Sequence, residues 1–542
     1  MKKILPFLIL LILPVFFYLS LQKYKDALGE YYLDRNYDPS YPYLINSLNL
    51  AQFNGFGVGL IAHPGTTVQE IGAVVLLIYH SFQAENNDLV RDVFNDPEFY
   101  LNKIFKTFLL MNTAAIFLLG YLIFKRTKSL ATAVFLQLSP FSFYSDDIFF
   151  QMTNVSVEPM LVFIILLLIT AIFIFLNNNG ADRKSLNYSI VFGVLCGLGM
   201  VTKISFLPVM MIPFLLIKEI KFRVIFILIS ILTFLIFVFP AFSAENADGF
   251  SVWIKDLVTH SGKYGKGSED FVQTSVYLSN IKTIFSQNLF FSLSYISLIS
   301  ILIFQFFKKH KSQIRSNKYF SLIAGIFIAM SLLILMVAKH FSLYYMIPAY
   351  MFSLLALFAV SSLIISLYPE FLKHKNKSYF YYAVIGIVLV FSIFQVRKIY
   401  KETKYAVGAR NDARVIIKSL EENYGNSIVV GSYQCSGKEF ALHLGSSFGG
   451  TQRANYMSIL KEMHPNNFYY NRWDNTFYQD WDIEYIREQL IKANKFIFQG
   501  KNDEVAKDFI NLVKKLTGKP NASYKKIISG YNRDCLYEIT LE

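Results

Sequence analysis

The acidic residues with the clearest chemical potential lie near the start of the chain. Asp34 and Asp38 follow a first apolar segment, and the turn His63-Pro64-Gly65 comes later in the same stretch. A carboxylate within hydrogen-bond reach of a hydroxyl can act as a general base. An isolated aspartate is more often a solvated loop residue, but the three tyrosines between residues 37 and 43 and the later turn favour chemistry here. The position beside an apolar segment predicts that this chemistry takes place at a membrane surface.

Further charged residues stand at the ends of later apolar segments. Glu158 precedes a proline at the start of one segment, and Lys203 lies between two others. A charge inside a membrane is costly, so we expect Glu158 to face a polar cavity and Lys203 to face a phosphate. Snorkelling of Lys203 towards the interface is the alternative. Asp146 and Asp147 lie shortly before Glu158, where a solvated turn explains them equally well.

The composition indicates which class of protein must position these residues. The chain has 542 residues, of which 54% are hydrophobic and 17% aromatic, and its mean hydropathy is +0.39. A soluble core needs far less apolar material, so we expect an all-α polytopic membrane protein. The formal net charge is +14, and most of the basic residues lie in short clusters between apolar runs. Such clusters orient helices in a bilayer, which excludes nucleic-acid binding as their reason.

Apolar runs of spanning length predict about eleven membrane helices, the short ones being the weakest. The runs lie at residues 4–20, 102–124, 129–144, 155–176, 187–202, 204–217, 223–242, 285–306, 319–338, 342–367 and 379–396. Basic clusters follow every second run, which predicts that they and the N-terminus are cytoplasmic. The odd number of spans then places the tail outside the cytoplasm.

This alternation divides the chain into two predicted domains. Residues 1–398 form a membrane domain whose first outer loop spans 21–101, and residues 399–542 form a small extracytoplasmic α/β domain. Within the outer loop, residues 66–80 are too short and too interrupted for a span and predict a helix that lies on the membrane surface. The loop 243–284 could hold a second such helix. We expect an integral protein of a bacterial inner or plasma membrane.

The tail has the pattern of a mixed domain. Short apolar runs at 427–433, 495–500 and 535–542 predict strands, and residues 412–425 predict a helix. Cys435 and Cys535 flank these strands, and we expect them to form a disulfide if the tail lies in an oxidising compartment. No spacing of metal-ligating residues and no phosphate-cradling loop is present, so we expect no cofactor, with a divalent metal possible but not indicated.

The order of features in the first outer loop resembles a known family. A span, an acidic residue, an aromatic-rich helix, a His-Pro turn and a surface helix follow one another, as in the membrane glycosyltransferases of the GT-C fold. The similarity is greatest to the group of protein O-mannosyltransferases and aminoarabinose transferases, which use polyprenyl-phosphate sugars. Asp38 matches the family's acid, whereas Pro39 stands where glutamate is usual, and His63-Pro64-Gly65 replaces His-Pro-Pro.

The resemblance implies roles for the residues named above. Asp38, with Asp34 as its rival, would be the base in an inverting sugar transfer, and the substrate site would include His63, Glu158, Asp146 and Asp147. Lys203 matches a lysine that follows a glycine-rich approach, and it would contact the donor phosphate. The family also has a basic residue followed by tyrosine at a later span, which here corresponds to Lys339 or His340 with Tyr345. For these last residues an aromatic belt with an interfacial lysine is the alternative.

The implied partners are a lipid-linked sugar donor and an acceptor that is a lipid, a glycan or a protein. Two other classes of function compete with this interpretation. A transporter or flippase of lipid-linked saccharides would carry charges at mid-span in two related halves, which the sequence does not display. A polymerase or ligase of surface polysaccharide would share the donor lipid but not the His-Pro loop.

Overall fold

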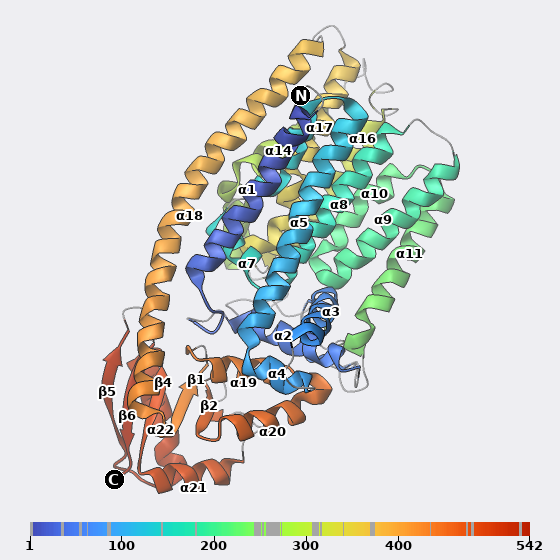
Figure 1. Cartoon of the computed structure of the whole chain (residues 1–542). Coiled ribbons are helices and arrows are strands. Elements are labelled where there is room, and N and C mark those ends of the chain that lie inside the picture. Colours follow the sequence, from blue (N-terminus) through green and yellow to red (C-terminus); the bar gives the residue numbers. More distant parts are fainter. Residues whose placement is uncertain are drawn as a thin grey trace.

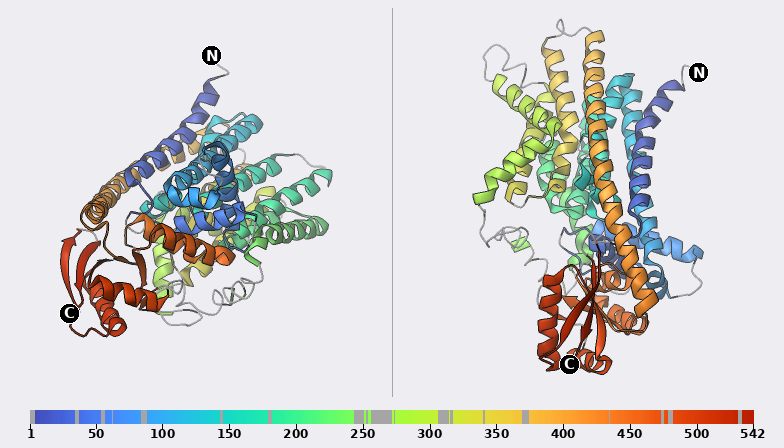
Figure 2. Two further views of the ribbon diagram at one scale, coloured as in Figure 1. Left: turned by 60° about the horizontal axis from the view of Figure 1, so that its bottom comes forward. Right: turned by 90° about the vertical axis from the view of Figure 1, so that its left-hand side faces the viewer.

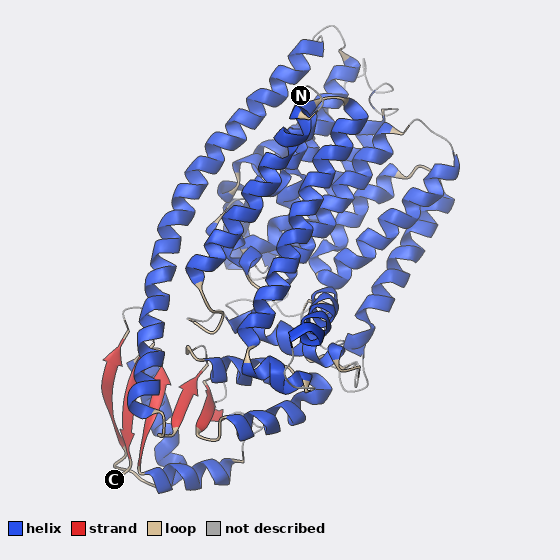
Figure 3. Cartoon of the chain, viewed as in Figure 1, coloured by secondary structure: helices blue, strands red, loops and turns tan. Residues whose placement is uncertain are grey.

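The structure is a computed structural model with side chains, and it shows a helical bundle joined to a small domain that contains a sheet (Figures 1 and 3). It describes the chain apart from residues 1–3, 34–36, 54–56, 62, 84–87, 143–144, 179–181, 243–250, 252–253, 256–271, 273, 306–313, 315–316, 340, 369–373, 434, 473–474, 478–481 and 531–533. Asp34, His340 and most of the loop 243–284 therefore lie outside the described residues.

Seven described helices are long and apolar enough to cross a membrane. They are α1 (Leu5–Leu28), α5 (Pro97–Thr127), α8 (Val157–Asn177), α9 (Asp182–Thr202), α11 (Ile220–Val238), α16 (Lys318–Lys339) and α17 (Ile347–Leu367). An eighth candidate is the pair α13 (Thr274–Gln287) and α14 (Leu289–Phe304), which meet at a bend of 103° (Figure 2). The protein is thus a polytopic helical membrane protein, as its composition predicts.

Two of the shorter predicted spans are broken into pieces. Residues 129–144 contain α6 (Leu130–Gln137) and the 3-10 turn η1 (Ser139–Phe141), followed by α7 (Asp146–Thr153). Residues 204–217 form the 3-10 helix η2 (Ile204–Met210) and then α10 (Met211–Leu216). Pro208 and Pro213 lack the backbone N–H that a continuous α-helix needs, which explains the interruption. Two further 3-10 turns, η3 (Phe239–Phe242) and η5 (Leu343–Met346), follow α11 and precede α17.

The predicted alternation of basic clusters agrees with the direction of the helices. The clusters 125–128 and 218–223 lie at the end of the bundle where the N-terminus lies, and the tail lies at the opposite end (Figure 1). Three helices of the first outer loop lie between the bundle and the tail. They are α2 (Tyr37–Ala51), α3 (Thr66–Gln83) and α4 (Leu89–Asn95). The region predicted to be a surface helix, 66–80, is α3.

One helix connects the bundle to the tail. Helix α18 (His374–Tyr424) has 51 residues without a proline, and at 1.5 Å per residue it is about 77 Å long. It runs beside α1 and ends against the sheet (Figure 1). It contains both the predicted span 379–396 and most of the predicted tail helix 412–425. The predicted domain boundary at 398 and 399 lies inside this helix, so the two domains share a continuous element.

The tail domain is a six-stranded mixed sheet covered by helices on both faces (Figure 3). The strands are β1 (Val429–Ser432), β2 (Asn467–Asn471), β3 (Thr476–Phe477), β4 (Lys495–Gly500), β5 (Ser523–Ser529) and β6 (Cys535–Thr540), in the order β3-β2-β1-β4-β6-β5. The central strand β1 is parallel to β2 and β4, and β6 is antiparallel to its neighbours β4 and β5. The three strands predicted from apolar runs correspond to β1, β4 and β6.

The helices of the tail divide between two cores. Helices α19 (Lys438–Ser447) and α20 (Arg453–Met463) contribute Phe440 and Tyr456 to the same continuous core as the bundle. Helices α21 (Ile483–Ala493) and α22 (Asp503–Thr517) cover the other face, where Phe509 stacks on Phe498 at 4.1 Å between ring centroids. The face with α19 is therefore the one that joins the tail to the membrane domain.

The predicted disulfide is wrong. Cys435 and Cys535 are both free and buried. Cys435 follows β1 and Cys535 begins β6, and β4 lies between these strands. Strands two positions apart are separated by about 9.5 Å, whereas a disulfide needs Cα atoms within roughly 7 Å. The sequence shows that both cysteines border strands, but it does not show the order of those strands.

We predict that denatured, unreduced protein exposes three thiols per chain, because Cys196 is also free. A thiol-reactive chromophore added with and without reductant measures this number. The variant Cys435→Ser, as a control, should lose one thiol in both conditions. A count of one thiol in the unreduced wild-type protein would mean that Cys435 and Cys535 form a disulfide. That result would contradict the strand order, in which β4 lies between β1 and β6.

Candidate active site

The candidate base lies where the outer loop begins its first helix. Asp38 has φ −104° and ψ 117°, an extended backbone in the first turn of α2. Pro39 explains this conformation, because a proline disfavours the helical region for the residue before it. The peptide bonds Asp38–Pro39 and His63–Pro64 are both cis. The kink separates Asp38 from the regular part of α2 and presents its carboxylate towards the tail domain.

The Asp38 carboxylate is accessible to solvent although protein surrounds it closely. A substrate can reach the carboxylate only if it is accessible, and the protein around the carboxylate sets its pKa. Desolvation raises the pKa of Asp38, and the hydrogen bond from the Tyr433 hydroxyl to Oδ2, at 3.0 Å, opposes that rise. A reachable carboxylate with a raised pKa is a stronger base than an ordinary aspartate.

A buried ion pair forms the second part of the site. Lys203 Nζ lies 2.7 Å from Glu158 Oε1, and the two side chains are 3% and 4% exposed. Glu158 is in the first turn of α8, and Lys203 follows α9 directly. Each residue was expected from the sequence to need polar surroundings. The structure shows that they supply these surroundings to each other, which satisfies both charges.

Aromatic rings cover the lysine of this pair. Lys203 Nζ lies 4.2 Å from the centroid of Tyr345 and 4.7 Å from that of Tyr344. Both tyrosines belong to η5, which follows the end of α16 at Lys339. Cation–π contacts of this kind stabilise a desolvated ammonium group. The basic residue that contacts Tyr345 here is thus Lys203, whereas the sequence pairs Tyr345 with Lys339 or His340 as possible ligands of the donor phosphate.

The His-Pro turn packs against the same ion pair. The Ile204 N–H donates to the His63 carbonyl at 2.9 Å, and the Gly65 N–H donates to the Val201 carbonyl at 2.9 Å. Desolvation, reinforced by the charge of Lys203, lowers the pKa of His63 to about 4, while Glu158 opposes that shift. The His63 side chain is therefore neutral near pH 7.

Tyr43 is a buried tyrosine on α2, the helix that begins beside Asp38. Its side chain is 1% exposed, and within the described part of the chain its hydroxyl has no hydrogen-bond partner. Burial raises the pKa of Tyr43, and the charges of Glu158 and Asp38 raise it further, so both carboxylates act on this hydroxyl. A Cβ atom at Gly65 would collide with the hydroxyl, and φ at Gly65 is +74°, so this position requires glycine.

A glutamate that the sequence did not single out holds the loop on both sides of Asp38. Glu98, in the first turn of α5, accepts a hydrogen bond from the Tyr31 N–H at 2.8 Å and from the Tyr41 hydroxyl at 2.9 Å. The loop is thereby fixed before and after the acid. Only a spatial neighbour of both tyrosines can do this, and sequence spacing does not reveal which residue that is.

The predicted site residues thus divide into three sets. His63, Glu158, Lys203 and Tyr345 lie together, whereas Asp38 is bonded by Tyr433 of the tail. Lys339 ends α16 immediately before the segment that carries Tyr345. Asp146 and Asp147 begin α7, but their side chains, like the residues Asp34 and His340, lie outside what the structure describes.

We predict that Lys203→Met lowers the thermal stability of the detergent-solubilised protein strongly, because it leaves the buried Glu158 carboxylate without its cation. Breaking a buried ion pair costs about 3–5 kcal/mol. The double variant Glu158→Gln/Lys203→Met should recover most of the loss, since both charges are then absent. Thermal unfolding measures all of these variants.

A matched control is Lys221→Met. Lys221 pairs with Glu219 at 3.0 Å, but these side chains are 66% and 37% exposed, and such a surface pair contributes at most about 1 kcal/mol. Equal melting temperatures for Lys203→Met and Lys221→Met would contradict the burial of the Glu158–Lys203 pair.

Comparisons with known proteins give a likeness among solved structures. No protein-family model matches the chain, and no curated protein matches it. Among solved structures, the chain is similar to the crystal structure of ArnT from Cupriavidus metallidurans bound to undecaprenyl phosphate, with 10% identity, 97% of each chain covered and a TM-score of 0.46.

Proposed function

We propose that this protein is a membrane glycosyltransferase that moves a sugar from a polyprenyl-phosphate donor to an acceptor hydroxyl. The observation that carries the proposal is the position of Asp38. It is an exposed acid with a raised pKa and lies just beyond the membrane helices. Its charge and that of Glu158, the partner of Lys203, both raise the pKa of Tyr43. A lipid-linked substrate presents its phosphate and sugar at this depth, because its polyprenyl chain stays in the bilayer.

The proposed reaction is a single displacement. Asp38 takes the proton from the acceptor hydroxyl, and the acceptor oxygen forms a bond to the anomeric carbon of the sugar. On the opposite face of that carbon, the bond to the phosphate oxygen breaks, and the polyprenyl phosphate leaves with the electron pair. The configuration at the anomeric carbon is therefore inverted. Donor and acceptor together balance the reaction, and no nucleotide is needed.

The departing phosphate needs positive charge in surroundings of low polarity, where electrostatic stabilisation is strongest. Lys203 is a candidate for this charge, but its pairing with Glu158 makes the two residues neutral as a unit. A dianionic leaving group would therefore gain more from an additional cation. We propose that Lys339 and His340, which precede η5, supply this charge.

The direction of the helices supports a site on the outer face. The basic clusters lie at the end of the bundle opposite to Asp38 and the tail, and such clusters are retained in the cytoplasm. We therefore propose that the tail and the site are extracytoplasmic. The acceptor would be a lipid, a glycan or a protein outside the cytoplasm. Transfer of label from a donor lipid to a separate acceptor distinguishes this activity from transport, which leaves the sugar on its lipid.

We predict that Asp38→Asn lowers the transfer rate by about 10²–10⁴, because an amide keeps the shape but cannot accept the proton. The assay uses membranes that contain the protein and a panel of radiolabelled polyprenyl-phosphate sugars, with the product's anomeric configuration read by NMR. Asp34→Asn should have a smaller effect, and Asp412→Asn, on the tail-side part of α18, should have none. Full transfer by Asp38→Asn would remove Asp38 from the mechanism.

A second prediction concerns the donor. Lys339→Met should weaken binding of a polyprenyl-phosphate analogue by about tenfold to a hundredfold, because methionine keeps the apolar stem and removes the charge. Titration of the analogue against the purified variant measures this. The double variant Glu158→Gln/Lys203→Met tests Lys203 by the same titration. It removes both charges of the ion pair, so no unpaired buried charge remains. Wild-type affinity in both variants would exclude both lysines as phosphate ligands.

A further inference from the structure

The tail domain reaches the candidate base through one residue. Tyr433 follows the last residue of β1, and its backbone N–H donates to the Tyr470 carbonyl of β2 at 3.2 Å. This bond continues the parallel ladder of β1 and β2 by one residue. The Tyr433 hydroxyl donates to Asp38 Oδ2 at 3.0 Å. One end of the tyrosine is therefore fixed in the sheet, and the other end is fixed on the carboxylate.

A buried polar network docks the tail on the same helix that carries Asp38. The side-chain amide of Asn46 donates to the Phe448 carbonyl at 2.9 Å, and its oxygen accepts from the Gly59 N–H at 2.7 Å. Asn49 donates to the Gly449 carbonyl at 2.6 Å and accepts from the Tyr456 hydroxyl at 3.0 Å. Both asparagines are fully buried. Because a buried amide that loses its partners is costly, these bonds define a single docked arrangement.

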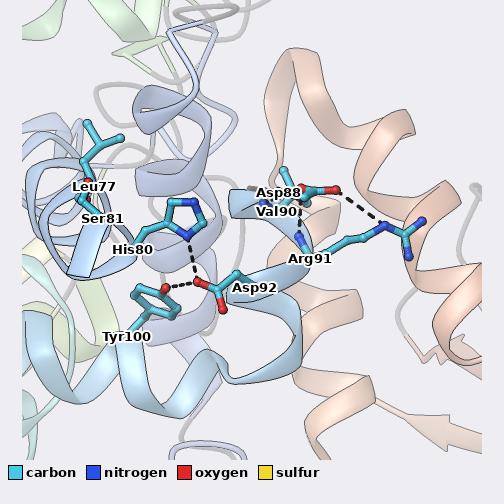
Figure 4. A network of polar contacts seen from close by, with 8 residues as sticks. All are labelled: Leu77, His80, Ser81, Asp88, Val90, Arg91, Asp92 and Tyr100. Carbon is cyan, nitrogen blue, oxygen red and sulfur yellow. Dashed lines mark hydrogen bonds and ion pairs between the residues drawn. The ribbon is translucent and has the colours of Figure 1, made fainter. Parts of the chain in front are cut away.

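The outer edge of the same interface carries charged contacts, which Figure 4 shows in part. Arg91 of α4 lies 2.7 Å from Glu462 of α20 and is also close to Asp88, which caps α4. On the other face of α4, Asp92 lies 2.9 Å from His80 of α3 and accepts a hydrogen bond from Tyr100 of α5. The outer loop is thus held to the bundle on one side and to the tail on the other.

We propose that Tyr433 is a positioning residue for Asp38, so that the tail domain is a part of the active site. This inference rests on the proposed role of Asp38 as the base. By donating to Oδ2, the hydroxyl fixes the rotation of the carboxylate and leaves Oδ1 to accept the proton of the acceptor. A tail that served only to recruit acceptors would need no contact with this carboxylate.

The positioning role of Tyr433 should be measurable through the pKa of Asp38. Among the described residues, the titratable groups that interact with this carboxylate are Tyr433, through its hydrogen bond, and Tyr43 on α2. The hydrogen bond lowers the pKa of Asp38, and desolvation raises it. Removal of the Tyr433 hydroxyl leaves desolvation unopposed, so the pKa should rise. The base is then protonated at a higher pH than in the wild-type protein.

The test is the pH profile of the variant Tyr433→Phe in full-length protein. We expect kcat to fall about tenfold, as for the loss of one hydrogen bond to a charged group, with the KM for the donor unchanged. We also expect the acidic limb of the profile of kcat/KM to move to higher pH. The position of this limb does not depend on how much of the protein is folded, so it separates positioning from a loss of stability.

The matched control is Tyr537→Phe. It removes from β6, in the same sheet, a hydroxyl that donates to Asp503 of α22 at 2.7 Å. Both kcat and the acidic limb should stay at their wild-type values. If Asp38→Asn is inactive while Tyr433→Phe keeps the wild-type kcat and limb, the positioning role is overturned and the proposed function stands. If Asp38→Asn is fully active, Asp38 is not the base, and the positioning role of Tyr433 is overturned as well.

Discussion

The ion pair between Glu158 and Lys203 is the interaction on which the arrangement of the membrane domain depends. Two buried charges are expensive to remove from water, and their attraction repays this only when the geometry is good, as the 2.7 Å contact is here. The pair joins the start of α8 to the end of α9, and the backbone next to Lys203 binds the His-Pro turn. The tyrosines of η5 close over the ammonium group. Four segments that are distant in sequence therefore meet where neither charge could be left alone. The main effect of the pair is to select one packing of these segments. An apolar pair of the same volume could be equally stable, but it would not hold the segments in this one arrangement.

The first outer loop connects this part of the membrane domain to the tail. Its first helix carries Asp38 at one end and the buried asparagines 46 and 49 on the side that meets the tail. Glu98 holds the loop from the bundle side, through Tyr31 and Tyr41. The loop is thus fixed by hydrogen bonds from two directions, and the apolar core is continuous from the bundle through α19. A rigid connection of this kind suits a catalytic group better than a flexible one, because small displacements of a base are costly to catalysis.

Local chemistry made some of this predictable from sequence. Pro39 forces the extended backbone of Asp38, the apolar runs locate the long helices, and the strand runs at 427–433, 495–500 and 535–542 correspond to strands in the tail. Features that depend on spatial order were not predictable. The run 204–217 looked like a continuous span although two prolines break it, and the proposed disulfide failed because β4 separates the strands that carry the cysteines. Tyr433 directly follows β1, the strand predicted at 427–433, but its partner Asp38 is 395 positions away. No local pattern connects residues at that distance.

The two carboxylates of the site are suited to different tasks because their surroundings differ. Glu158 is buried against a cation, so its charge is already matched, and using it as a base would break the pair that organises the domain. Asp38 is an exposed residue, and among the described residues it is bonded by a tyrosine and by no cation. Desolvation by the protein around it therefore leaves its pKa raised. Two carboxylates whose surroundings push their pKa values apart take different chemical roles. The accessible acid can take up a proton without cost to the fold, whereas protonation of the paired acid would leave the buried charge of Lys203 unmatched. The tail contributes to this difference, since it provides the neutral donor that holds Asp38 in place without neutralising it.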